Sequence, residues 1–456
     1  MKFVNLTRRT EIGANSYYLE CAGRGLILDS GMHPKFEGDE ALPNLNAVSG
    51  RKPDAIIISH SHQDHIGTLP VLMRRQPQAR VFMTEPTAQI GDVLLHNSVN
   101  VMTRQREELG TTLYPLFTHR EVDRVRERWQ LCALRQTYTL SGERAPAETS
   151  ETTFEFFEAG HVLGSTGVLL RTEGRTVFYT GDVNFDDQTI AQAAVFPEDK
   201  IDILITECTR GDTPVPPTWS RPTEEKRFME AIENAFTRGG CVLIPVFALG
   251  KTQEVLAMLY KMRREKVLDF PIYIGGLSTK ISEIYDQRAQ MGRRQLPRLQ
   301  LLDELRPFVL NADNINDAEA RPGRVYALSS GMMTPKTLSN IFAQRIVEQP
   351  RHSIFFVGYA DPESPAGILR NAQANEQVTV DPDRAPQTVR CHMEQFQFSA
   401  HASRESLIAF AERLAPKKIV LVHGDPPAVE WMRARLASNL PNSEVIVPAP
   451  GVKLDL

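Results

Sequence analysis

The chain has 456 residues, of which 41% are hydrophobic and 24% are charged, and its formal net charge at pH 7 is −4. This length exceeds what one ordinary hydrophobic core organises, so we expect two domains of a globular protein. No apolar run approaches the roughly 18 residues that a membrane span requires. The slightly acidic balance also excludes a globally basic nucleic-acid-binding protein, so any positive charge that holds a nucleic acid must be local.

The amino-terminal residues 1–7 lack the long apolar core of a signal peptide. The five cysteines are scattered along the chain and form no C-x-x-C pair. This usage predicts reduced, mostly buried thiols and a cytoplasmic location. The cysteines are Cys21, Cys132, Cys208, Cys241 and Cys391.

The first candidate site residue is Asp29, which ends an apolar run at 25–28 just before a glycine turn at Gly31. The run predicts a strand, so Asp29 is expected at the end of that strand. One interpretation is a simple turn-forming aspartate. The alternative is a carboxylate that orients a metal ligand, and its position upstream of a histidine-rich turn favours this role.

That histidine-rich turn follows residues 55–58, a short β-branched run that predicts a buried strand, and precedes a helix-like segment at 66–72. In such a turn, residues two apart converge on one point while their neighbours face a second point. This is the arrangement that a two-metal site needs, and imidazole and carboxylate ligands suit Zn²⁺ with open positions for water. The four ligand-type side chains of the turn are His60, His62, Asp64 and His65.

Residues 87 to about 135 are helical in pattern and rich in both charges. Their mixed signs indicate a solvated helix face rather than a nucleic-acid-binding patch. Three further apolar runs, at 154–160, 176–181 and 201–206, then predict strands, and each delivers a ligand-type residue at its end. Sites in layered α/β folds are built at strand ends in this way. The three residues are His161, Asp182 and Glu207.

The sequence changes character at the proline-rich segment 211–223, which predicts a linker. Beyond it, helices expected at about 223–238 and 251–266 alternate with apolar runs. This alternation predicts a parallel sheet covered on both faces. The expected strands lie at 241–246, 271–275, 324–328 and 353–358.

Ligand-bearing turns return near the carboxyl end of the sequence, where His401 precedes a helix and His423 follows a buried strand at 418–422. Histidine-bearing elements therefore lie on both sides of the second α/β block. The simplest topology is a first domain, 1–208 and 386–456, that is interrupted by a second domain at 209–385.

Together these motifs resemble the metallo-β-lactamase fold and, within it, the β-CASP branch of nucleic-acid-processing nucleases, along essentially the whole chain. The resemblance implies an α/β fold in which an αββα sandwich is interrupted by an inserted α/β domain with a parallel sheet. Further phrases that match the branch lie at 239–250, 329–332 and 357–359. The branch's motifs correspond to Asp29, to the turn His60–His65, to His161, Asp182 and Glu207, and to His401 and His423.

The resemblance also implies two zinc ions. His60, His62, His161 and Asp182 would hold one, while Asp64, His65, His423 and the shared Asp182 would hold the other. A hydroxide between the metals would attack the scissile phosphorus. His401 would serve the leaving oxygen as a proton donor, and Glu207 would fix its tautomer.

Three residues are expected to contact substrate: Lys251, Ser330 and Ser399. Lys251 stands where relatives commonly have an arginine, and it keeps the positive charge without the bidentate fork. Residues 271–278 and 361–367 depart from the phrases usual in the branch, on the side of the cleft where family members hold RNA.

The leading hypothesis is a zinc-dependent ribonuclease that cleaves single-stranded RNA as an endonuclease, a 5′→3′ exonuclease, or both. A second hypothesis is a metallo-hydrolase of another phosphodiester, either DNA or a small molecule, on the same fold. The third is a non-catalytic binding subunit, which the complete ligand set disfavours. The resemblance allows a homodimer, and no membrane partner is expected.

Overall fold

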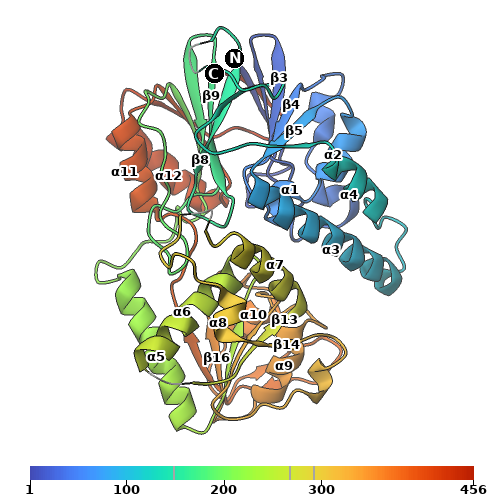
Figure 1. Cartoon of the computed structure of the whole chain (residues 1–456), viewed down its shortest axis with the longest axis vertical. Helices are drawn as coiled ribbons and strands as arrows, with labels where there is room; N and C mark the ends of the chain where they lie inside the picture. Colours follow the sequence, from blue (N-terminus) through green and yellow to red (C-terminus); the bar gives the residue numbers. More distant parts are fainter. Residues whose placement is uncertain (147–148, 267–268, 291–292) are drawn as a thin grey trace. The chain divides into compact units, whose positions relative to one another are not determined.

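The computed structural model describes residues 1–146, 149–266, 269–290 and 293–456. The chain divides into two compact units (Figure 1). Unit 1 contains Met1–Asp186, Ala193–Val215 and His401–Leu456, and unit 2 contains Asp187–Gln192 and Pro216–Ala400. The expected boundary at 208/209 therefore lies inside unit 1. The one at 385/386 lies inside unit 2, because the strand β19 (His392–Gln395) pairs with that unit's sheet.

Unit 1 is built on two mixed sheets of seven strands each. The first contains, in spatial order, β22 (Lys453–Asp455), β1 (Lys2–Asn5), β2 (Tyr17–Cys21), β3 (Arg24–Leu28), β4 (Ala55–Ile57), β5 (Arg80–Met83) and β6 (Trp129–Leu131). The second contains β21 (Glu444–Ile446), β20 (Lys418–Val422), β11 (Ile203–Glu207), β10 (Arg175–Tyr179), β9 (Thr166–Thr172), β8 (Thr153–Glu158) and β7 (Thr137–Thr139).

Both sheets of unit 1 are buried on both faces, and the alternation of side chains along β3 shows why. Leu26 and Leu28 join a core that also contains Phe154 and Ile203 of the second sheet, so this core lies between the sheets. Ile27 points the other way and packs under helices. Because successive side chains of a strand face opposite sides, a strand covered on both faces reads as a continuous apolar run.

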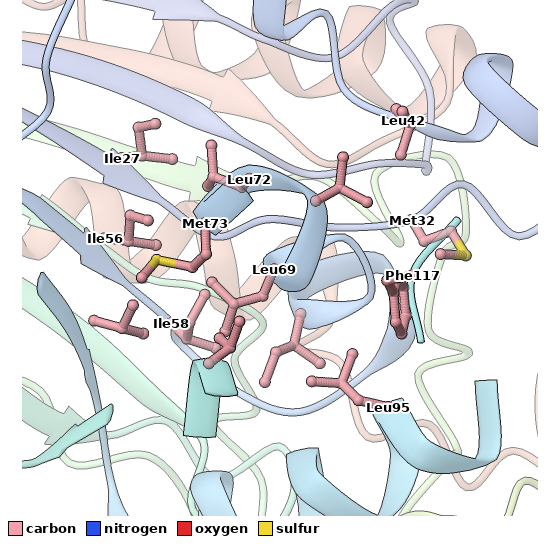
Figure 2. Packing of buried hydrophobic residues seen from close by; sticks show 14 of the residues in the cluster. Ile27, Met32, Leu42, Ile56, Ile58, Leu69, Leu72, Met73, Leu95 and Phe117 are labelled. Carbon is pink, nitrogen blue, oxygen red and sulfur yellow. The ribbon is translucent and has the colours of Figure 1, made fainter. Parts of the chain in front are cut away.

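Helices cover the outer faces of the two sheets in unit 1. Against the first sheet, Leu69 and Leu72 pack on Ile27 and Ile56, as Figure 2 shows. Against the second sheet, Leu407 and Met432 join a core with Leu204. These layers give the αββα sandwich that the family resemblance implies. The helices of unit 1 are α1 (Gln63–Ile66), α2 (Leu69–Arg75), α3 (Glu85–Leu109), α4 (His119–Arg126), α11 (Arg404–Leu414) and α12 (Pro426–Asn439).

The single helical segment expected at 87 to about 135 is wrong in detail, because the structure forms α3, α4 and the strand β6 there. Helix α3 ends at Gly110, whose φ of 61° is the left-handed conformation that stops a helix. Helix α4 begins anew after Thr118, whose side chain caps it in a capping box with Glu121.

Unit 2 contains a six-stranded sheet in which every neighbouring pair is parallel, as the alternation of strands and helices predicts. Its spatial order is β14 (Phe308–Leu310), β13 (Ile272–Gly275), β15 (Val325–Leu328), β12 (Val242–Pro245), β16 (Ser353–Phe356) and β19. Its helices are α5 (Arg221–Thr237), α6 (Lys251–Lys266), α7 (Gly276–Gln287), α8 (Leu301–Leu305), α9 (Leu338–Ile346) and α10 (Pro365–Asn371). None of the helices among the described residues is long and apolar enough to cross a membrane.

Candidate metal centre

The histidine-rich turn is fixed by backbone hydrogen bonds to two neighbouring segments of unit 1. The carbonyl of Asp64 accepts from the backbone N–H of Asn15 at 3.0 Å, and the carbonyl of His65 accepts from Ser30 at 2.7 Å. Gly31 packs so closely that a Cβ there would lie 1.8 Å from the carbonyl oxygen of Asp64. The turn therefore holds its imidazoles in place through main-chain contacts rather than through side-chain packing alone.

A first cluster of converging ligand atoms joins three histidines and one aspartate, which lie in the turn and at two strand ends. His62 Nδ1 lies 3.1 Å from His60 Nε2 and 3.0 Å from His161 Nε2. Asp182 Oδ2 lies 3.6 Å from both of these Nε2 atoms. The four atoms all lie within 4.8 Å of one another, as the donor atoms of one metal site do. Burial lowers the pKa values of His60 and His62, which favours the neutral rings that ligate metals.

A second cluster lies beside the first and joins Asp64, His65 and His423. Asp64 Oδ2 lies 3.6 Å from His65 Nε2 and 3.2 Å from His423 Nε2. Burial opposes the ionisation of Asp64, yet His65 and His423 lower its pKa to about 2. The group is thus a carboxylate at neutral pH.

Asp182 links the two clusters. While its Oδ2 faces His60 and His161, its Oδ1 lies 3.3 Å from His65 Nε2 and 3.2 Å from His423 Nδ1. Among the described residues, no donor makes a hydrogen bond to this buried Oδ1. Burial opposes the charge of Asp182, but His423, His65 and His401 hold its pKa well below its usual range. A buried, ionised carboxylate with an unsatisfied oxygen, between two groups of imidazoles, fits a ligand shared by two divalent cations.

Asp29 lies behind the second cluster and outside both groups of ligand atoms. Its Oδ1 accepts from the N–H of Ser59 at 2.7 Å, while its Oδ2 accepts from the hydroxyls of Ser59 and Tyr179 at 2.8 and 2.6 Å. The same Oδ2 lies 2.8 Å from His65 Nδ1. This contact supports the interpretation that Asp29 orients a metal ligand.

His401 and Glu207 form a pair next to Asp182. Glu207 Oε2 lies 3.0 Å from His401 Nδ1, while Oε1 accepts from the N–H of Val183 at 2.7 Å and is thereby fixed. Burial opposes protonation of His401, but Glu207 and Asp182 raise its pKa. The side chain of His401 retains 23% exposure, so its ring borders both the clusters of ligand atoms and solvent.

Three polar residues at this site have no counterpart among the residues expected from the sequence. Asn15 Nδ2 lies 3.2 Å from His65 Nε2, and the Thr209 hydroxyl lies 2.9 Å from His423 Nδ1. Arg210 donates to the backbone carbonyl of His401 at 3.4 Å. A polar residue before or after a strand carries no particular signal, so only the packing of distant segments reveals these contacts.

The residues expected to contact substrate lie in unit 2. Lys251 begins α6, and its amine donates to the carbonyl of Phe398, directly before the half-buried Ser399. The hydroxyl of Ser330 lies 2.9 Å from that of Thr334. Their roles in substrate binding stay a prediction.

Family models match three segments of the chain. Residues 9–94 match the model of the metallo-beta-lactamase superfamily, and residues 252–369 match that of the Beta-Casp domain. Residues 386–448 match the model of the Zn-dependent metallo-hydrolase RNA specificity domain. The three matches together span more than half of the chain and contain Asp29, the histidine-rich turn, His401 and His423, whereas His161, Asp182 and Glu207 lie between the first and second matches.

Proteins similar over nearly the whole chain include the endoribonuclease ysh1 of Schizosaccharomyces pombe, which is 27% identical over 98% of this chain and 57% of its own length. Cleavage and polyadenylation specificity factor subunit 3-I of Arabidopsis thaliana is 28% identical over 97% of this chain and 61% of its own length. The chain thus spans little more than half the length of these curated relatives. A crystal structure of a protein of unknown function from Enterococcus faecalis V583 covers the whole chain with a TM-score of 0.57 at 12% identity, which shows a shared fold.

Proposed function

Because the chain belongs to the β-CASP family of metallo-β-lactamase-fold proteins, we propose that it is a zinc-dependent ribonuclease that hydrolyses phosphodiester bonds of single-stranded RNA. One observation carries the proposal: two groups of metal-ligand atoms meet at Asp182, and the His401–Glu207 pair borders the same carboxylate. In this arrangement, one phosphate of the substrate could contact both cation sites and the proton-donating His401.

Two zinc ions fit the donor set. His60, His62, His161 and Asp182 would hold one ion, and Asp64, His65, His423 and Asp182 the other; imidazole and carboxylate are the ligands that Zn²⁺ takes in catalytic sites. When bound, the ions supply Lewis-acid chemistry, which stabilises negative charge on the phosphate and acidifies water.

Side chains of the site determine which nitrogen of His401 exchanges a proton with the substrate. Glu207 accepts the Nδ1–H of His401, which fixes the tautomer and leaves Nε2 as the nitrogen that exchanges a proton with substrate. Glu207 and Asp182 raise the pKa of His401, so its ring holds a proton more readily than a free imidazole and can donate it to the leaving oxygen. Asp29 and Thr209 hold the rings of His65 and His423 in position.

RNA is the substrate that the similarities favour. The carboxyl-terminal segment matches an RNA specificity domain, and several relatives are named endoribonucleases, which favours internal cleavage over removal of nucleotides from the 5′ end. The cytoplasmic location stays a prediction, supported by five buried, unpaired cysteines. A homodimer also stays a prediction, which the mass in solution would test.

The experiment is cleavage of a 5′-labelled single-stranded RNA by the wild-type protein, by the protein treated with a chelator, and by His401→Ala. We expect cleavage by the wild type alone, and the fragment pattern separates internal cuts from release of mononucleotides. His392→Ala is the matched control, since this histidine is exposed on β19 of unit 2 and should leave activity unchanged.

Intact RNA after incubation with wild-type protein that carries two zinc ions would overturn the proposal. A protein that then hydrolyses DNA or a small chromogenic phosphodiester would be a metallo-hydrolase of another diester on the same fold. Unchanged cleavage by His401→Ala would support the ribonuclease activity but contradict the proposed role of His401 as a proton donor.

A further inference from the structure

A ladder of aromatic rings crosses one face of the sheet in unit 2 and reaches solvent at the edge strand β14. The rings of Phe308 and Tyr273 stack with centroids 5.1 Å apart and an interplanar angle of 23°. Tyr273 stacks on Tyr326 at 4.6 Å and 16°, and Tyr326 stacks on Phe342 of α9 at 4.1 Å. Phe342 and Tyr326 are buried, whereas Phe308 is 57% exposed. The ladder therefore presents a rigidly supported aromatic ring to solvent.

A cavity of about 530 Å³ lies beside this ladder, between the segment 316–322 and the end of α9. Its charged lining consists of three arginines, Arg321, Arg345 and Arg351, and one acid, Glu319. Arg321 pairs with Glu319 at 2.8 Å, which leaves the other two guanidinium groups without a compensating acid in the lining. In a chain with a net charge of −4, this is a local concentration of positive charge.

Hydrogen bonds connect the ladder to the cavity. The hydroxyl of Tyr326 donates to the backbone carbonyl of Glu319 at 2.7 Å, so the second tyrosine of the ladder touches the cavity wall. Arg324 donates to the hydroxyl of Tyr273 at 2.9 Å and adds a fourth arginine at the ladder itself. The ladder is thus tied by hydrogen bonds to the segment that lines the cavity.

The arginines of the cavity are partly preorganised. Arg345 donates to the backbone carbonyls of Ile315 and Ala318, which fixes its guanidinium group at the cavity wall. Arg351 is exposed, and its guanidinium group donates to Gln349 at 3.3 Å. Two guanidinium groups, one held by backbone carbonyls and one exposed, can contact successive phosphates of a nucleic-acid chain.

We propose that this surface is a second binding site for single-stranded RNA in unit 2, at which a base stacks on Phe308 and the neighbouring phosphates contact Arg345 and Arg351. The inference rests on the proposed ribonuclease function, since it concerns the same substrate. An aromatic platform beside a cationic groove is the combination that binds single strands without sequence preference. A purely apolar protein partner would leave the guanidinium groups of the cavity unpaired at the interface.

The test measures the affinity of a fluorescent, long single-stranded RNA in the presence of a chelator, so that hydrolysis plays no part. We expect Phe308→Ala to weaken binding by about 5-fold or more, since stacking on one base contributes about 1–3 kcal/mol. Phe308→Tyr keeps the platform and should bind like the wild type. We expect Arg351→Ala to weaken binding and to reduce the slope of log affinity against log salt by about 0.7, since one phosphate contact is lost.

Two controls remove similar groups from unit 1. Leu113→Ala deletes an apolar side chain that is 61% exposed, and Arg433→Ala deletes an arginine that pairs with Glu430 on α12. Neither should change RNA affinity. All variants should hydrolyse a small chromogenic phosphodiester at the wild-type rate, because this substrate reaches only the metal centre.

RNA affinity that is unchanged in Phe308→Ala and in Arg351→Ala would overturn the second site. A change in the mass of either variant in solution would also overturn it, because the surface would then be a contact with a second copy of the chain. Because binding and cleavage are measured separately, failure of the second site can be distinguished from failure of the proposed activity. A wild-type protein that binds RNA through Phe308 but cleaves none would refute the ribonuclease and retain the site.

Discussion

Asp29 Oδ2 lies 2.8 Å from His65 Nδ1, and this contact sets which nitrogen of His65 faces the metal centre. A carboxylate oxygen at this distance accepts a hydrogen bond from the Nδ1–H of His65, which makes Nε2 the nitrogen available to a metal ion. The lone pair of Nε2 then points to the side where Asp182 Oδ1 lies 3.3 Å away. Asp29 is completely buried, and Ser59 and Tyr179 hold it in turn. The aspartate is therefore placed to orient the ring of His65 toward the candidate metal centre.

The first prediction concerns Asp29→Asn, which keeps the size of the side chain but removes its charge. We expect a 10- to 100-fold lower affinity for zinc, since the support of a ligating histidine typically contributes that much. Competition with a zinc-binding dye measures the affinity. Tyr179→Phe is the control, because it removes one donor to Asp29 and leaves the contact with His65. Equal zinc affinity of Asp29→Asn and Tyr179→Phe would contradict the orienting role.

The second prediction uses the number of bound metals to test the shared position of Asp182. We expect His161→Ala to weaken one zinc site and Asp182→Ala to weaken both, because Asp182 Oδ1 and Oδ2 face different clusters. Metal content after dialysis, measured by mass spectrometry, separates one ion from two. His401→Ala should retain both ions, since His401 pairs with Glu207. Loss of a single ion from Asp182→Ala would show that the carboxylate serves only one cluster.

The sequence places several of the expected ligands near strand ends, and the structure brings these side chains together. Three strands end just before His161, at Glu207 and just before His423. Strand ends are recognised from apolar runs, and parallel neighbours bring such ends together; β11 and β20 pair in parallel with Glu207 opposite Val422. The order of the motifs along the chain therefore carries most of the information about this site.

Contacts between segments that are distant in the sequence could not be predicted from sequence patterns. Asn15 contacts His65 because two loops that are distant in the sequence pack together. The composition of neither loop indicates that it packs against the other. The ladder from Phe308 to Tyr326 depends on the register of β14, β13 and β15, which is set by pairing in the folded sheet. The division of the expected helix before residue 135 depends on the left-handed conformation of Gly110, and a glycine within a helical pattern does not by itself define a helix end.

The third prediction compares two glycine substitutions. In Gly31→Ala the new Cβ would lie 1.8 Å from the carbonyl oxygen of Asp64, and backbone cannot yield as a flexible side chain can. We expect this variant to lose zinc. We also expect its free energy of unfolding to be about 3 kcal/mol lower than that of the wild type, which is the upper range of overpacking effects. Gly276→Ala meets no atom within 4 Å at the start of α7 and should be as stable as the wild type. Chemical denaturation compares the two variants, and equal stability would show that the turn adapts.

The fourth prediction concerns pH and a histidine far along the chain from the metal ligands. His352 is fully buried at the start of β16, where its Nδ1 accepts from the backbone N–H of Cys241 at 3.0 Å and its Nε2 lies 3.1 Å from Gln349 Oε1. The Cys241 thiol lies 3.2 Å away, and burial raises its pKa to about 12, so it stays neutral. Burial, and secondarily the charge of Arg351, lowers the pKa of His352 to about 4.

A lowered pKa in the folded state makes protonation favour the unfolded chain. The unfolded histidine takes up its proton as the pH falls through about 6.5, while the folded one stays neutral until about pH 4, so stability is lost within this window. The loss amounts to about 2 kcal/mol between pH 7 and pH 5. His352→Asn keeps an acceptor for Cys241 but does not titrate. Urea denaturation of the metal-free protein at both pH values should therefore show a loss of stability that is about 2 kcal/mol smaller in the variant than in the wild type. An identical pH dependence in both proteins would show that His352 binds its proton equally in the folded and unfolded states.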